Sequence, residues 1–173
     1  MNSEELCKCP NLPQMITLEQ FKGNYDLYDS YLYNEVFLKE LYNFKMIFRG
    51  KVVELKSYPL FEEKEESYFH LTCKIYEKNS VTRKPDLRRS ERLSWLKPSI
   101  ETDHNNTCKQ SCFLMYERPY KKYNRICLLN PADRYFIVLE ERKGYYLLIT
   151  AYYIEYDNTL RKKLKEYSKY KMN

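Results

Sequence analysis

The chain has 173 residues, with 30 Lys and Arg against 24 Asp and Glu, and a formal net charge of +6 at pH 7. It contains 19 tyrosines and 8 phenylalanines but only three glycines, which stand far apart at Gly23, Gly50 and Gly144. A Walker loop and a dinucleotide fingerprint both need clustered glycines, so both are excluded. Two histidines, His70 and His104, exclude a His-rich metal cage. The length and aromatic content predict one folded unit.

The positive charge is concentrated in the later part of the chain. Residues 1–60 carry seven basic and eight acidic groups, whereas residues 61–173 carry 23 and 16. This asymmetry favours a polyanionic partner such as RNA. A solvated basic surface would give the same pattern, and charge alone does not distinguish it from a surface that binds a polyanion.

The cysteines and the N-terminal sequence indicate the cellular compartment in which the protein is expected. No basic segment followed by an apolar segment opens the chain, and no apolar run reaches the length of a membrane span. We therefore expect a reduced, cytoplasmic protein with no membrane partner. The six cysteines are then free thiols rather than a disulfide framework; they are Cys7, Cys9, Cys73, Cys108, Cys112 and Cys127.

The N-terminal segment, residues 1–44, is expected to be a polar lead followed by aromatic-rich helices. Thr17 and Gln20 form the pattern of a capping box, and the helical region 17–43 is expected to break near Gly23. A hairpin is predicted over 45–56 with its turn at Arg49 and Gly50, followed by a loop over 58–66.

Residues 67–76 alternate between apolar and polar side chains, which predicts a half-buried strand. His70, Thr72 and Lys74 would then share the polar face of that strand. A neutral imidazole suits proton transfer to or from a ribose hydroxyl, because its pKa lies near physiological pH. The alternative for His70 is a hydrogen-bonded surface histidine.

The remainder of the chain predicts an α+β core over 45–173. A basic helix starts at Asp86 and runs to about Lys97, and residues 102–111 are a polar loop. Strands are expected over 112–117, 125–129, 134–141 and 145–154, with a final helix over 158–170. The predicted architecture has N-terminal helices and the central basic helix packed on a four- to five-stranded, mainly antiparallel sheet, with a C-terminal helix.

The basic helix is a candidate phosphate-binding element. Arg88, Arg92 and Trp95 lie at i, i+4 and i+7, so they share one helix face. Arginine binds phosphate with two parallel hydrogen bonds, although a solvated helix would have the same charges. The predicted substrate-binding residues are Arg83, Arg88, Arg89, Lys74, Thr72 and Trp95.

Two weaker patterns complete the candidates. Tyr146, Thr150 and Tyr152 are predicted on one face of the last strand, where hydroxyls can donate to a phosphate; equally, they are ordinary strand formers. His104, Cys108 and Cys112, with Cys127, are zinc-ligand types, but their spacing is loose and no second tight pair accompanies them. The sequence thus predicts no metal and no cofactor.

The Phe-His-Leu-Thr segment at 69–72, the arginine-rich helix ending in Trp-Leu-Lys-Pro, and the Leu-Leu-Ile-Thr-Ala-Tyr-Tyr strand together resemble a known group of proteins. They are similar to the phage-type branch of the barnase–EndoU–colicin–RelE nuclease superfamily, over residues 45–170. The family's glycine-bearing continuation after Phe-His-Leu-Thr is replaced by Cys73.

The resemblance implies a small metal-independent endoribonuclease or RNase-type toxin of a phage or mobile element. RNA, including tRNA, would be the substrate, and an antitoxin or immunity protein a partner. The implied catalytic residues are His70, Thr150 and Tyr152 with an arginine of the basic helix, Arg92 before Arg88. The alternative is a non-catalytic RNA- or protein-binding accessory protein that uses the same basic, tyrosine-rich surface.

Overall fold

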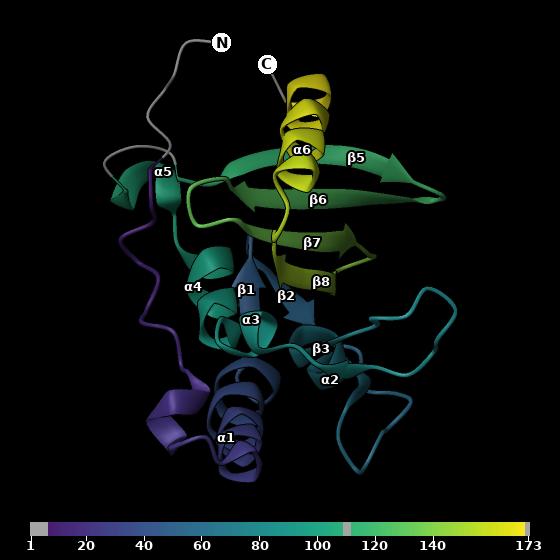
Figure 1. The fold of residues 1–173 in the computed structure, drawn as a ribbon. Helices are drawn as coiled ribbons and strands as arrows, with labels where there is room; N and C mark the ends of the chain where they lie inside the picture. The colour runs from purple at the N-terminus through teal and green to yellow at the C-terminus, as the bar shows by residue number, and fades with distance from the viewer. Residues whose placement is uncertain (1–6, 109–111, 172–173) are drawn as a thin grey trace.

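The computed structural model describes residues 7–108 and 112–171. Its centre is a six-stranded sheet in the order β1-β2-β8-β7-β6-β5, with helices on both faces (Figure 1). The predicted α+β class with a C-terminal helix is confirmed. No helix of the described residues is both long and apolar enough to cross a membrane.

Four consecutive strands form an antiparallel meander. They are β5 (Leu114–Tyr120), β6 (Tyr123–Asn130), β7 (Tyr135–Glu141) and β8 (Tyr146–Tyr153). The predicted hairpin is confirmed as β1 (Met46–Phe48) and β2 (Lys51–Glu54), with positive φ angles at Arg49 and Gly50 in its turn. Because β2 pairs in parallel with β8, the hairpin extends the sheet to six strands rather than four or five.

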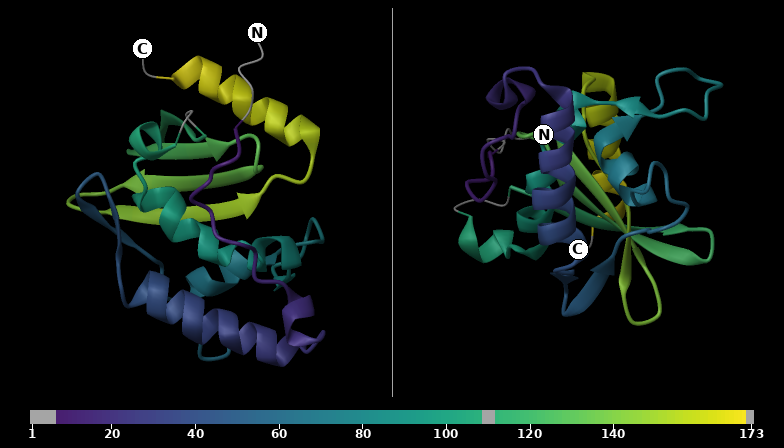
Figure 2. Two further views of the ribbon diagram at one scale, coloured as in Figure 1. Left: turned by 90° about the vertical axis from the view of Figure 1, so that its left-hand side faces the viewer. Right: turned by 90° about the horizontal axis from the view of Figure 1, so that it is seen from below.

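The two faces of the sheet are covered differently. The first face packs against the larger core, to which the long helix formed by α1 (Tyr25–Tyr31) and η2 (Leu32–Tyr42) contributes Tyr28, Leu32 and Phe37. The second face packs against α6 (Asp157–Tyr170), which contributes Leu160, Leu164 and Tyr167. Figure 2 shows α6 on one side of the sheet and α1 on the other. The N-terminal helices therefore share a core with the sheet.

The strand predicted over residues 67–76 is wrong, because this segment is mostly helical. Helix α2 spans Glu66–Thr72, and only Cys73–Lys74 (β3) is extended, paired with Lys84–Pro85 (β4). The buried residues Ser67, Tyr68, Leu71 and Thr72 recur at helical rather than alternate spacing. Apolar and polar residues alternate by chance over this short helix, and a strand has the same alternation.

The predicted helix over 86–97 is broken into shorter pieces. Asp86 caps α3 (Leu87–Ser90), as expected, by accepting from the backbone amides of Arg88 and Arg89. The chain continues as η3 (Leu93–Trp95) and α4 (Leu96–Glu101), and the predicted polar loop contains the short helix α5 (His104–Thr107). The N-terminal region also contains η1 (Leu18–Phe21), before the break near Gly23.

A β-bulge in β8 changes which side chains share a face. Thr150 pairs with Val138, but the neighbouring Leu139 pairs with Leu148, so Ile149 is the extra residue. Tyr146 consequently packs in the larger core, whereas Tyr152 packs against the core beneath α6. The prediction that Tyr146 shares a face with Thr150 and Tyr152 is therefore wrong.

Candidate functional site

A cleft of about 400 Å³ lies between α2 and the part of the sheet that α6 leaves open. It is lined by aromatic, cationic and hydroxyl-bearing side chains from α2, the β5–β6 turn and three strands. The polar and aromatic lining residues are Lys56, Ser67, His70, Tyr120, Lys121, Tyr123, Arg125, Glu140, Arg142 and Thr150.

The register of the meander places these side chains in rows across the sheet. Tyr120 pairs with Tyr123, and Arg125 pairs with Glu140. Residues at alternate positions of a strand face the same side, and Cys127, two positions after Arg125, belongs to the core beneath α6. The cleft is therefore the uncovered continuation of the face that α6 covers further along.

A buried carboxylate holds two arginines at the floor of the cleft. The Arg125 Nε donates to Glu140 Oε2 at 2.9 Å, and the Arg142 Nη2 donates to Glu140 Oε1. The Glu140 side chain is only 3% exposed, so this ion pair is well shielded from water. The guanidinium groups lie over aromatic rings, Arg125 at 3.4 Å from the Tyr120 centroid and Arg142 at 3.9 Å from that of Tyr123.

The lining carries an excess of positive charge. Lys56, Lys121, Arg125 and Arg142 are opposed within it by one carboxylate, that of Glu140. Cationic side chains beside flat aromatic rings suit a ligand that combines phosphate groups with stacking bases. The lining thus combines an excess of positive charge with flat aromatic surfaces.

His70 lies at the rim of the cleft on α2. Its Nε2 is 3.4 Å from Glu66 Oε1, and its two ring nitrogens are 3.3 and 3.2 Å from the Arg83 Nη2. Burial and the neighbouring Arg83 charge lower the His70 pKa below its usual value, and Glu66 opposes that shift. The ring is therefore neutral at pH 7 and able to accept a proton.

Thr150 lines the same cleft as His70, although 80 positions separate them in the sequence. Because Thr150 pairs with Val138 across the β8 bulge, it lies on the sheet face that α6 covers further along. The cleft lies on the same face. An imidazole and a hydroxyl thus face one cationic cleft.

Arg89 is a positioning residue between α2 and β8. Its Nη1 donates to the backbone oxygens of His70 at 2.8 Å and Cys73 at 3.3 Å, and its guanidinium lies 5.5 Å from the Tyr152 centroid. Burial lowers the Arg89 pKa and raises that of Tyr152. Tyr152 also packs edge-on against Phe136 and does not line the cleft. Arg89 thus fixes the backbone of His70, and Tyr152 packs against Arg89.

The two arginines favoured from the helix periodicity lie away from the cleft. Arg92 is over the Trp95 and Tyr153 rings, at 5.1 and 4.3 Å, and donates to the Arg88 carbonyl. Arg88 pairs with Glu155 at 3.0 Å. Tyr153 follows Tyr152 on the opposite face of β8, which explains why this arginine face does not reach Thr150.

Three more predicted binding residues are structural. Thr72 is buried and donates to the Tyr68 carbonyl within α2. Trp95 is buried with its Nε1 donating to the Pro13 carbonyl at 2.8 Å. Lys74 pairs with Asp86 at 3.3 Å. Of the predicted binding set, Arg83 contacts the ring of His70, and Arg89 contacts its backbone oxygen.

The sequence analysis missed the arginine pair and its aromatic partners. Alternation along 123–127 places Tyr123, Arg125 and Cys127 on one strand face, and Tyr120 and Tyr123 bracket a short turn. Those signals are visible in the sequence. The pairing of Arg125 with Glu140 is not, because it depends on the register between β6 and β7.

Four metal-ligand side chains converge elsewhere in the described residues. They are Cys9, His104, Cys108 and Cys112, and their ligand atoms lie within 4.8 Å of one another. Cys127, which the sequence considers together with these residue types, is buried in the core beneath α6 and does not belong to this cluster. Helix α5, which carries His104, lies apart from α2 (Figure 1), and none of the four residues lines the cleft.

No family model matches the sequence, and neither a curated protein nor a solved structure matches the chain. The resemblance to the nuclease superfamily accordingly remains a prediction from short motifs. Any function assigned to this chain therefore depends on the residues that line the cleft.

Proposed function

We propose that the protein is a metal-independent endoribonuclease whose active site is the cleft between α2 and the sheet. The observation that carries the proposal is the convergence of His70, Thr150 and the Arg125–Glu140–Arg142 cluster on one cavity. This group supplies a proton acceptor, a hydroxyl donor and two cations, which are the functions that RNA cleavage through its own 2′-hydroxyl requires.

The binding step rests on charge and stacking. Arg125 and Arg142 are held by Glu140, so they meet the scissile phosphate without prior rearrangement. The Tyr120 and Tyr123 rings at the mouth of the cleft offer surfaces for bases, each worth roughly 1–3 kcal/mol in stacking. Lys121 adds a cation beside them.

The chemical step begins with the neutral His70 removing the proton of a ribose 2′-hydroxyl. The 2′-oxygen attacks the adjacent phosphorus, the bond to the 5′-oxygen breaks, and the departing oxygen takes a proton from water in the open cleft. The hydroxide left behind takes the proton from His70, which regenerates the neutral ring. The products are a 2′,3′-cyclic phosphate and a 5′-hydroxyl. Thr150 donates to a non-bridging oxygen, and the arginines neutralise the charge that develops on the phosphorane.

The test is cleavage of an end-labelled RNA and of the same oligonucleotide with 2′-deoxyribose throughout. We expect cleavage of the RNA only, with cyclic phosphate ends, and a fall of about 10²–10⁴-fold in rate for His70→Ala. Lys39→Gln is a matched control, because Lys39 is exposed on η2, far from the cleft lining.

Three results would contradict the proposal. Cleavage of the deoxy substrate rules out attack by the 2′-hydroxyl, and an unchanged rate for a folded His70→Ala variant removes the proposed base. Salt-sensitive RNA binding without cleavage would instead support the alternative, a non-catalytic RNA-binding accessory protein. That alternative uses the same cations and rings and leaves His70 dispensable.

A further inference from the structure

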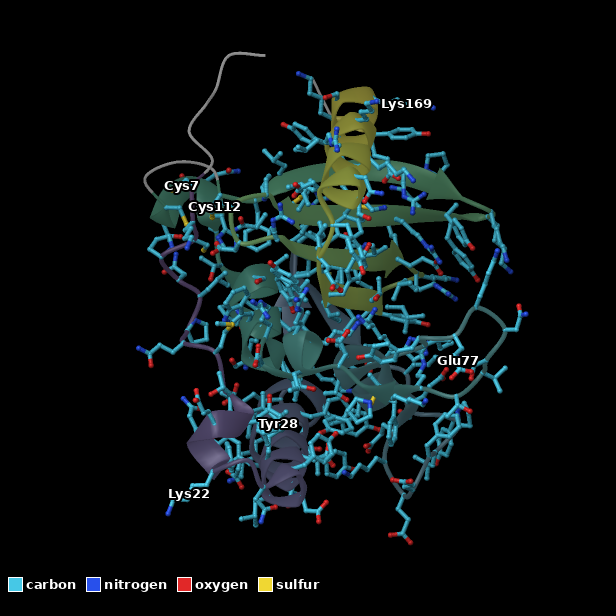
Figure 3. All side chains as sticks on the ribbon, viewed as in Figure 1. Cys7, Lys22, Tyr28, Glu77, Cys112 and Lys169 are labelled. Atoms are coloured by element: carbon cyan, nitrogen blue, oxygen red, sulfur yellow. The ribbon has the colours of Figure 1, made fainter. Side chains whose placement is uncertain are left out.

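The N-terminal segment brings Cys9 beside α5, next to three residues that are close together in the sequence. The Cys9 Sγ lies 3.5 Å from the His104 Nδ1 and 3.9 Å from the Cys108 Sγ. The Cys112 Sγ lies 3.3 Å from the same nitrogen and 3.4 Å from the Cys108 Sγ. All four residues are buried, and Figure 3 shows Cys112 beside α5.

These separations are those of a tetrahedral metal site. Zinc binds sulfur at about 2.3 Å and imidazole nitrogen at about 2.0–2.1 Å. A regular tetrahedron with those bond lengths has sulfur–sulfur edges of about 3.8 Å and sulfur–nitrogen edges of about 3.6 Å. The observed sulfur–sulfur edges of 3.4 and 3.9 Å and sulfur–nitrogen edges of 3.3–3.6 Å lie close to both values. The described cysteines are free thiols, with no disulfide among these three.

The histidine is oriented as a ligand. The His104 Nε2 is 3.0 Å from the Ser99 carbonyl oxygen, to which only a protonated nitrogen can donate. That hydrogen bond leaves the lone pair on Nδ1, the nitrogen that faces the three sulfurs. A carbonyl that accepts from the other ring nitrogen and so fixes the tautomer is a regular feature of histidine–zinc sites. The ring also packs against Phe113, with the centroids 4.6 Å apart and the planes tilted by 37°.

The surroundings suit thiolates. The Asn11 side-chain amide donates to the Cys108 Sγ at 3.4 Å, and the Cys9 backbone amide donates to Asp133 at 2.8 Å in the turn between β6 and β7. The first contact offsets sulfur charge, and the second fixes Cys9 to the sheet. Without a cation, three buried thiols would gain little from this arrangement.

We propose that Cys9, His104, Cys108 and Cys112 bind one zinc ion in a closed, structural Cys₃His site. Three thiolates and one imidazole are a typical zinc set, and four protein ligands leave no open position for catalysis. The site joins the N-terminal segment to α5 across 95 sequence positions. This inference is independent of the proposed nuclease function, since none of the four residues lines the cleft.

The experiment measures metal in the full-length protein purified without added chelator. We expect one zinc per chain by elemental analysis. Metal-free, reduced protein should bind one equivalent of Co²⁺ with the intense visible and near-ultraviolet absorption of tetrahedral cobalt thiolate, and zinc should displace it. Cys9→Ser should lose the metal, while Cys7→Ser, two positions earlier and outside the cluster, should keep it.

The outcomes separate the site from its alternatives. A folded protein that contains no zinc and binds neither zinc nor cobalt overturns the proposal, and so does a disulfide between any two of the three cysteines found by mass spectrometry. Loss of metal from Cys7→Ser as well as Cys9→Ser also overturns it. If Cys9→Ser does not fold, His104→Cys decides: retained cobalt with a spectrum of four sulfurs supports the site, and no cobalt binding contradicts it.

Discussion

The two histidines of this chain lie in opposite environments. His70 is 35% exposed at the rim of a cationic cleft, with both ring nitrogens near a guanidinium. His104 is 8% exposed, with one nitrogen on a backbone carbonyl and the other facing three sulfurs. One imidazole thus lies beside charged groups at the rim of a cleft, whereas the other directs its Nδ1 at three sulfurs. The groups around each histidine ring determine the chemistry that is open to it.

The largest expected contrast is in stability. In zinc-containing buffer, His104→Ala should lower the free energy of unfolding by about 3 kcal/mol or more, because it removes a ligand whose binding free energy contributes to folding. His70→Ala should cost less than about 1 kcal/mol, since its ring is partly exposed. Urea unfolding with and without chelator measures both. Equal losses for the two variants would contradict the comparison.

The next effect concerns the cations of the cleft. Arg142→Gln should weaken binding to single-stranded RNA about tenfold and reduce the salt dependence of the affinity by about one phosphate contact. Lys39→Gln makes the same change in net charge on η2 and should leave both quantities near wild type. Fluorescence anisotropy over a salt series tests this. Equal losses for the two variants would show that only net charge matters.

The pH dependence sharpens the role of His70. Desolvation and Arg83 lower its pKa, so cleavage should be constant at pH 7 and fall about tenfold per pH unit only once the pH drops below that lowered pKa. Because the folded pKa of His70 lies below the unfolded one, the neutral ring's contribution to stability is likewise lost as pH falls through the folded pKa.

Arg83→Gln should move the acidic limb of the pH–rate profile to higher pH, because it removes a positive charge that lowers the His70 pKa. Lys84→Gln, its exposed neighbour, should not.

The smallest effect is expected at Thr150. Thr150→Val keeps the shape of the side chain but removes the hydroxyl, which should reduce the cleavage rate by about 2–10-fold, the net worth of one hydrogen bond. The same substitution at Thr159, on α6 and outside the cleft lining, serves as the control. An unchanged rate for Thr150→Val would remove the hydroxyl from the mechanism.

Sequence patterns predicted the strands of the meander and the final helix well, because long alternating or helical runs leave little ambiguity. They failed at α2, where one turn of helix mimics alternation, and at the β8 bulge, which no local pattern reveals. His70 and Thr150 were found from chemistry and from a resemblance. Arg125 was missed, because its pairing with Glu140 depends on register. Cys9 was missed because its neighbours come from a chain segment 95 positions away.

The bulge in β8 also limits how this strand can change in length. Residues before Ile149 direct Tyr146 and Leu148 into the larger core, and residues after it direct Tyr152 towards α6. Deleting Ile149, the extra residue of the bulge, would leave Leu148 paired with Leu139 and Thr150 with Val138, so the other side chains of β8 would keep their faces. Deleting a paired residue of β8 instead would turn one half of the strand over, and either the core or the cleft would then receive the wrong side chains.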